Sequence, residues 1–231
     1  MTEIKDVKVY DLEECMIASG YAMRTDPINY EEERGLLNHY KRCSKLVLAS
    51  KYSDIHCHDN FLTGIRVSFD IKYPQYLSPE MQRYHFYDIV TSMSKMHRLS
   101  KMTLRKATNK YTSPESIIEA QKQVDKYNTL LEDSSITEYS YWDTSTEYDK
   151  KVVVKGREEV LYAAFMVMLS SIPLGLELWM RVSTNYKQLQ TIYYQRRHHK
   201  LVEDWGAIIK MIEGLPYFEE FILGNSDNET V

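Results

Sequence analysis

Residues 181–200 read RVSTNYKQLQTIYYQRRHHK and hold the pattern on which the interpretation of the whole chain depends. Four side chains recur here at spacings of four, three and four residues: Asn185, Leu189, Ile192 and Arg196. At about 100° per residue, this spacing forms one narrow stripe of an α-helix, with an amide and a guanidinium at the two ends of an apolar seam. A helix whose buried stripe serves packing alone would be expected to end that stripe in an apolar residue and not in an arginine. The stretch therefore predicts a helix over 184–199 that supplies an anion-binding group to a pocket.

The composition is that of a folded protein with one substantial domain. The chain has 231 residues, 43% of them hydrophobic and 27% charged, and a net charge of −4. Because this balance is slightly acidic, it argues against a nucleic-acid coat protein and against a polybasic membrane binder. We expect neither a nucleic acid nor a membrane among its partners. The 19 tyrosines suit pockets and subunit interfaces, and an exposed Tyr-rich surface is the equal alternative.

Cysteine usage and the chain start indicate a cytoplasmic protein. Cys15, Cys43 and Cys57 show neither CxxC spacing nor an even-numbered framework, which is typical of a reducing compartment. The first residues lack the apolar core of a signal peptide, and the longest apolar run, 160–169, is too short to span a bilayer.

A metal site is not expected. A strand through His56-Cys57-His58 would place both imidazoles on one face. Zinc takes four ligands, however, and no second cluster at ligand spacing follows. The sequence also has no glycine-rich phosphate loop and no serine-hydrolase or kinase signature.

Alternation and helix-start signals divide the chain into elements. Strands are predicted at 5–12, 65–72 and 174–182. Helices are predicted at 28–50, 78–96, 113–131, 158–171, 184–199 and 201–213. The polar stretch 132–151 is predicted to be a long loop or flap, and 225–231 a disordered tail. Helices and strands mix without a regular βαβ rhythm, which indicates an α+β fold.

The stripe of residues 185–196 resembles a motif of the flavin-dependent thymidylate synthases, the ThyX family. That motif reads Asn-x-Arg-x-Leu-x-x-Phe-x-x-x-Arg, and here Lys187 replaces the first arginine and Ile192 the phenylalanine. The family has a proline and an apolar strand just upstream, matched by Pro173 and 174–182. Its closing aromatic segment is similar to 215–221.

A second block of sequence resembles the same family. Family members have a histidine followed by a strand of the form Phe-Thr-Phe-His-Val-Lys-Ala-Pro. Here His58 precedes VSFDIKYP at 67–74. Two colinear blocks at a compatible separation imply a ThyX-like α+β fold, a mixed sheet flanked by helices in a single domain over 1–224.

The family's Arg-His-Arg signature is degraded. Counting on from Pro74 without a gap places Arg83-Tyr84-His85 at its first three positions. With an insertion of one or two residues after them, the later serine and arginine correspond to Ser94 and Arg98. A rival alignment uses Met96-His97-Arg98 as the remnant. A basic residue that the family uses for the substrate phosphate is Leu169 here, so either another arginine substitutes or the substrate is not the usual nucleotide monophosphate.

The resemblance implies reductive one-carbon transfer to C5 of the pyrimidine deoxynucleotide dUMP. It implies FAD as cofactor, NADPH and methylenetetrahydrofolate as co-substrates, and a homotetramer. Arg196 would be catalytic and substrate-binding. The residues implied for the cofactor are His58, Arg83, His85, Asn185 and Lys187, and those implied for the substrate, besides Arg196, are Ser94, His97 and Arg98.

Three alternatives stay open. The enzyme could hydroxymethylate rather than methylate a pyrimidine C5, as Leu169 and the degraded signature suggest. The chain could be a non-catalytic nucleotide-binding or assembly protein on the same fold. Arg196 could also be a solvated cation at a helix C-terminus, which the macrodipole favours by roughly 0.3–1 kcal/mol without any ligand.

Overall fold

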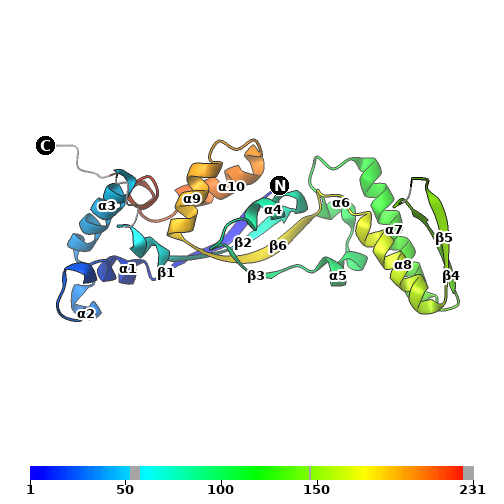
Figure 1. The fold of residues 1–231 in the computed structure, drawn as a ribbon, viewed down its shortest axis with the longest axis horizontal. Helices are drawn as coiled ribbons and strands as arrows, with labels where there is room; N and C mark the ends of the chain where they lie inside the picture. Colours follow the sequence, from blue (N-terminus) through cyan, green and yellow to red (C-terminus); the bar gives the residue numbers. More distant parts are fainter. Residues whose placement is uncertain (53–57, 146, 226–231) are drawn as a thin grey trace. The chain divides into compact units, whose positions relative to one another are not determined.

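The computed structural model describes residues 1–52, 58–145 and 147–225, and the chain forms two compact units (Figure 1). The first, which we call the sheet unit, consists of Thr2–Tyr73, Leu77–Thr91 and Trp179–Val231. The second, which we call the hairpin unit, consists of Met1, Pro74–Tyr76 and Ser92–Leu178.

A four-stranded sheet of order β1-β2-β6-β3 forms the centre of the sheet unit. Its strands are β1 (Glu3–Tyr10), β2 (Arg66–Pro74), β6 (Glu177–Asn185) and β3 (Asp88–Ser92). β1 pairs antiparallel with β2 and has a bulge between Lys5 and Lys8. β2 and β6 are also antiparallel, because Tyr186 N donates to Ile65 O at one end and Gln75 N to Leu176 O at the other.

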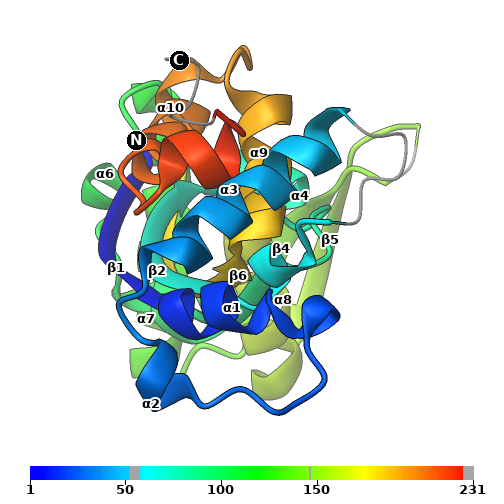
Figure 2. The same cartoon turned by 90° about the vertical axis from the view of Figure 1, so that its left-hand side faces the viewer.

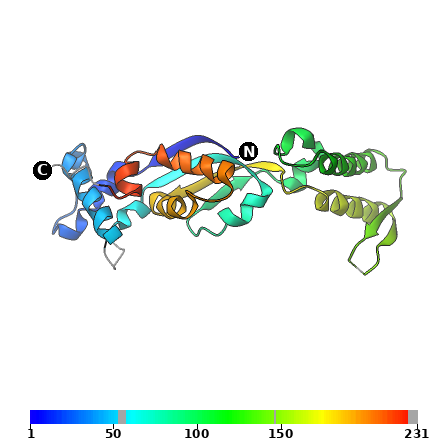
Figure 3. The same ribbon diagram turned by 90° about the horizontal axis from the view of Figure 1, so that it is seen from above.

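The two central strands have a strict period of two. Val67, Phe69 and Ile71 of β2 are fully buried, whereas the intervening side chains are half-buried. The same alternation runs along β6. Figures 1 and 3 show α9 (Tyr186–Arg196) and α10 (Val202–Glu213) lying over this sheet. These two helices bury apolar side chains of their own, among them Leu189 and Ile192 of α9 and Ile208 and Ile212 of α10.

Further helices complete the sheet unit. They are α1 (Leu12–Ala18), α2 (Tyr30–Glu33), α3 (Leu37–Tyr52) and α4 (Ser78–Met81), with 3₁₀ turns at Tyr21–Met23 and Asn60–Thr63 and a π-helical turn at Phe218–Ile222. A 3₁₀ turn at Gln75–Leu77 precedes α4, and only its last residue belongs to this unit. α1 packs against α3, as Figure 2 shows.

The hairpin unit contains two packed helices and a β-hairpin. α7 (Pro114–Glu132) packs against α8 (Arg157–Ser170), and α8 contacts the antiparallel pair β4 (Glu138–Asp143) and β5 (Lys150–Lys155). Two shorter helices, α5 (Lys95–Arg98) and α6 (Leu104–Ala107), and a 3₁₀ turn at Leu99–Lys101 precede them. The core of this unit is a cluster of buried side chains: Leu130, Tyr139, Val160, Ala163 and Ala164.

The α+β class and most of the predicted elements are confirmed. The strands at 5–12 and 65–72 and the helices at 113–131, 158–171 and 201–213 match β1, β2, α7, α8 and α10 within three residues. The strand at 174–182 and the helix at 184–199 are β6 and α9, with the boundary displaced to Asn185–Tyr186. The assignment of 1–224 to one domain stays a prediction.

The prediction of one continuous helix at 28–50 is wrong in the middle of that range. The helix is interrupted between α2 and α3, because Arg34 is extended and Gly35 adopts a left-handed φ of 74°. Glu13 Oε1 accepts from Gly35 N at 2.7 Å and holds the break in place.

The helix predicted at 78–96 is also wrong. α4 ends at Met81, and β3 follows after an irregular segment at 82–87. Phe86 explains the difference, since its N–H donates to Gln188 Oε1 at 3.2 Å and its carbonyl accepts from Thr184 Oγ1 at 2.7 Å. These partners lie far along the chain, and they override the local helix signal.

The flap predicted at 132–151 is mostly ordered chain: α7 ends at Glu132, β4 fills 138–143 and β5 begins at Lys150. The valines at 152–154 and the tyrosines at 139 and 141 supply the β-branched and aromatic side chains that strands prefer.

Of the predicted tail, Asn225 bonds to Glu219 through its backbone and its side chain, and 226–231 lie outside the described residues.

We expect Ser113→Ala to destabilise the hairpin unit. Ser113 caps α7, because its side-chain oxygen accepts from Ser116 N at 3.1 Å. Loss of such a cap costs about 1 kcal/mol of unfolding free energy. Urea unfolding of the two proteins measures the difference. Ser113→Asp, which retains a capping oxygen, is the control, and an equal loss in both variants would contradict the capping role.

Candidate functional site

The stripe at 185–196 folds as predicted and delivers Arg196 to a cavity. Leu189 and Ile192 are fully buried, and burial of each contributes roughly 1.5–3 kcal/mol. Asn185 is the N-cap of α9, and its side-chain oxygen accepts from Gln188 N at 2.8 Å. With the seam buried and the helix start capped, the direction of the Arg196 side chain follows from the helical period.

Arg196 is held on two sides. Its Nη1 donates to Glu80 Oε2 at 3.0 Å, and its Nε donates to Tyr84 Oη at 2.7 Å. The guanidinium carbon lies 4.7 Å from the centre of the Trp205 ring and 5.7 Å from that of Tyr84. With a side-chain exposure of 14%, Arg196 is not a solvated cation at a helix end.

A cavity of about 340 Å³ opens beside this arginine, and we call it the Arg196 cavity. α9 contributes Gln188, Thr191, Gln195 and Arg196, and the irregular segment after α4 contributes Arg83, Tyr84 and His85. The lining therefore contains two permanent cations and a histidine, and it contains no carboxylate.

The polar groups that this cavity offers are predominantly hydrogen-bond donors. Gln188 Oε1 accepts from Phe86 N, and Gln195 Oε1 accepts from Tyr84 Oη at 3.1 Å. Both glutamine oxygens are thus used inside the protein, which leaves the amide N–H groups for a ligand. An acceptor-rich ligand, such as a phosphate or a ring with carbonyl oxygens, suits this lining.

Three of the predicted site residues meet here: Arg83, His85 and Arg196. Arg83 and His85 were predicted to lie on the helix at 78–96, and that prediction is wrong, because both residues are exposed members of the irregular segment 82–87. Gln188, Thr191 and Gln195 were not predicted as site residues, although their spacing of three and four residues places them on one face of α9.

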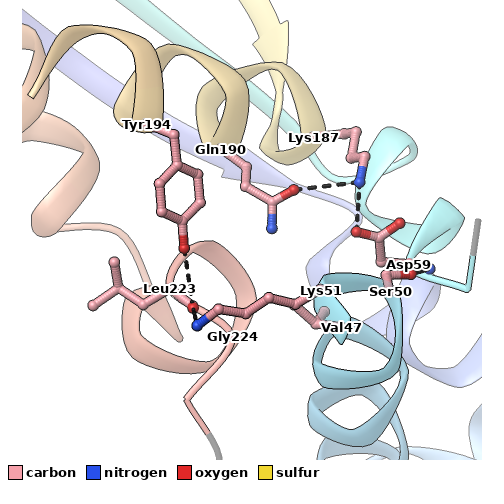
Figure 4. A pocket seen from close by; sticks show the side chains of 9 residues that line it. All are labelled: Val47, Ser50, Lys51, Asp59, Lys187, Gln190, Tyr194, Leu223 and Gly224. Atoms are coloured by element: carbon pink, nitrogen blue, oxygen red, sulfur yellow. Dashed lines mark hydrogen bonds and ion pairs between the residues drawn. The ribbon is translucent and has the colours of Figure 1, made fainter. Parts of the chain in front are cut away.

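Lys187 faces a second cavity of about 360 Å³, drawn in Figure 4. Its Nζ lies 2.5 Å from Oδ2 of the buried Asp59 and 3.3 Å from Gln190 Oε1. Across the cavity, Leu223 O accepts from Lys51 Nζ and from Tyr194 Oη (Figure 4). The charge of Lys187 is therefore neutralised within the chain, and its expected role with the cofactor stays a prediction.

The remaining predicted residues occupy other positions. Asn185 is 2% exposed and caps α9, and His58 is an exposed turn residue beside Asp59. Ser94, His97 and Arg98 belong to the hairpin unit, at the start and along the length of α5, and Leu169 lies on α8 of that unit. Their roles with cofactor and substrate stay predictions.

No group of three or more His, Cys, Asp or Glu side chains suited to a metal ion occurs among the described residues. His56 and Cys57 of the histidine pair considered above lie outside them. Within the same described ranges, every helix is too short or too polar to cross a lipid bilayer.

Comparison with solved structures identifies the class of fold. The chain's antiparallel strands flanked by helices match the fold of solved flavin-dependent thymidylate synthases. Two crystal structures of ThyX from Helicobacter pylori, both with FAD and dUMP, are similar to this chain at TM-scores of 0.54 and 0.55 and sequence identities of 14% and 15%. The similarity covers 96% of this chain and 97% and 96% of those chains. It confirms the ThyX-like fold. The sequence matches no protein-family model and no curated protein.

We expect Asn185→Ala to lower the unfolding free energy by about 1 kcal/mol through loss of the cap on α9. Asn185→Ser retains a capping oxygen and should stay close to the parent protein in urea unfolding. If Asn185 also contacts a flavin, both variants will weaken FAD binding by a similar factor. An equal stability loss in the two variants would refute the capping role.

The described thiols should be unreactive at neutral pH. Burial raises the pKa of Cys15 to about 11, with Asp11 and Glu14 adding to the shift, and burial also raises the pKa of Cys43. Since the thiolate is the nucleophile, this raised pKa lowers the thiolate fraction of Cys15 at neutral pH roughly 100-fold. In a Cys57→Ser background, labelling by a disulfide reagent should be slow in the folded protein, fast in urea, and faster as the pH rises. Rapid labelling of the folded protein at neutral pH would show an activated cysteine.

Proposed function

We propose that this protein binds FAD and a pyrimidine deoxynucleotide and transfers a one-carbon unit reductively to C5 of dUMP. One observation carries the proposal: Arg83, His85 and Arg196, which the ThyX resemblance selects from two separate segments, line a single donor-rich cavity. The full-length fold similarity to ThyX structures that contain FAD and dUMP supports it.

The residues of the Arg196 cavity fit such ligands in part. Ligand pockets occupy about 300–1,000 Å³, and this one, at about 340 Å³, has room for a nucleotide or for a portion of FAD. Its cations and amide N–H groups match the phosphates of either molecule and the carbonyl oxygens of a uracil or flavin ring. When bound, reduced flavin supplies the hydride, and methylenetetrahydrofolate supplies the one-carbon unit.

The chain's own residues then position the substrate and stabilise charge. Arg196 would donate to a uracil carbonyl oxygen and stabilise the negative charge that develops on the ring as C5 reacts. Arg83 has no ion pair among the described residues and would neutralise the nucleotide phosphate in place of the basic residue lost at Leu169. The protonated thiols of Cys15 and Cys43 agree with a reaction that needs no cysteine nucleophile. The homotetramer, the cytoplasmic location and the use of NADPH belong to the same proposal.

One observation favours a second candidate, a protein that binds the nucleotide without turnover. Arg196 already has an anionic partner in Glu80, which reduces the net charge available to a reacting ring. Product analysis by mass separates the candidates. A methyl group on C5 supports the proposed synthase, a retained oxygen identifies a hydroxymethylase, and binding without product identifies a binding protein.

We expect two arginine variants to weaken nucleotide binding in different ways. In calorimetry on the FAD-supplemented protein, Arg196→Ala should raise the dissociation constants of both dUMP and deoxyuridine by about tenfold to a hundredfold, because a hydrogen bond from a charged group to the base is lost. Arg83→Ala should weaken the binding of dUMP by a similar factor and leave the binding of deoxyuridine unchanged, because deoxyuridine has no phosphate.

The control is Lys210→Ala, which removes an exposed cation from α10. It should leave both dissociation constants unchanged. Flavin absorbance bands that survive gel filtration, and that shift on addition of dUMP, would support the cofactor assignment. A colourless protein that does not retain added FAD would refute the flavin part of the proposal.

A further inference from the structure

Glu80 joins three segments of the sheet unit behind the Arg196 cavity. Its Oε2 accepts from Arg196 Nη1 at 3.0 Å and from Trp205 Nε1 at 3.1 Å. His199 Nε2 lies 3.5 Å from the same oxygen. A carboxylate of α4 thus holds the last residue of α9, the turn that follows it, and the first turn of α10.

The hydrogen bonds of His199 indicate which ring nitrogen carries the proton. Leu201 N donates to His199 Nδ1 at 3.2 Å, so Nδ1 is an acceptor. In the neutral ring the hydrogen is therefore on Nε2, the nitrogen that faces Glu80. All three neighbours of Glu80 Oε2 thus present hydrogens to it.

Arg196 is fixed along two of its edges and on one face. Nε is bound by Tyr84 Oη, Nη1 is bound by Glu80, and the Trp205 ring stacks at 4.7 Å. No described residue accepts from Nη2. The guanidinium is planar, so once Nε and Nη1 are held, the direction of the two Nη2 hydrogens is determined.

We propose that Glu80 is a positioning residue, which holds the Arg196 guanidinium against Trp205 so that Nη2 presents its hydrogens to an oxygen of the ligand in the Arg196 cavity. This inference rests on the proposed function for its ligand. Without Glu80, the arginine side chain could rotate about its terminal bonds, and binding would bear the cost of ordering it.

A double-mutant cycle on the FAD-supplemented protein tests this role. Glu80→Ala should weaken dUMP binding by roughly tenfold, and it should have no further effect on binding in an Arg196→Ala background, because the proposed effect of Glu80 on the ligand passes through the Arg196 side chain. Glu80→Gln retains an acceptor oxygen but loses the charge of the ion pair, so it should weaken dUMP binding less than Glu80→Ala does. Glu213→Gln, an exposed acid at the end of α10, is the matched control and should bind as the parent does.

A second measurement does not depend on any ligand and covers the case in which Glu80→Ala folds poorly. In the parent protein, nitrogen-15 NMR should show slow rotation of the Arg196 guanidinium. Rotation should be faster in Glu80→Gln and unchanged in Glu213→Gln.

The outcomes separate the two proposals. If Arg196→Ala weakens dUMP binding but Glu80→Ala does not, Glu80 is not a positioning residue. The same conclusion follows if the two effects add in the double variant. In both cases the proposed function remains. If Arg196→Ala leaves dUMP binding intact, the role of Arg196 in the proposed function and the positioning role of Glu80 are both refuted. Slow rotation of the Arg196 guanidinium would then identify a purely structural ion pair.

Discussion

The ion pair between Glu80 and Arg196 is the interaction on which the candidate site depends. Arg196 leaves the end of a buried helical seam, and burial of a guanidinium without a partner would cost several kcal/mol. Glu80 supplies that partner, and Trp205 and Tyr84 provide an aromatic environment that suits a weakly hydrated cation. The same contacts that make burial tolerable also restrict the orientation of the side chain.

The electrostatics of the two cavities follow from how their cations are partnered. In the cavity of Figure 4, Lys187 is matched by the buried Asp59. In the Arg196 cavity, one arginine is paired from behind and Arg83 is exposed without an ion pair among the described residues. The lining of the Figure 4 cavity thus includes a carboxylate beside its two lysines, whereas the lining of the Arg196 cavity has none, although both cavities border the same helix.

Much of the fold could be read from periodicity. The alternation of β2 and the long helices α7, α8 and α10 match the predicted ranges, because in these segments local preference and burial favour the same structure. The errors occur where partners distant in sequence decide. Residues 82–92 leave the predicted helix because Phe86 bonds to Thr184 and Gln188. The valines at 152–154 form a strand because they pair with β4.

The sequence by itself determined that residues 185–196 form one helical stripe with an amide at its start and an arginine at its end, since this placement depends only on the helical period. It also placed Arg83 and His85 among the candidates through resemblance. Only the tertiary structure decided that these residues share a cavity with Arg196, and that Glu80 and Trp205 hold the arginine. The segment of Glu80, Arg83 and His85 is more than a hundred residues from Arg196, as the separation of 116 between Glu80 and Arg196 shows, and no local pattern encodes contacts over such a distance.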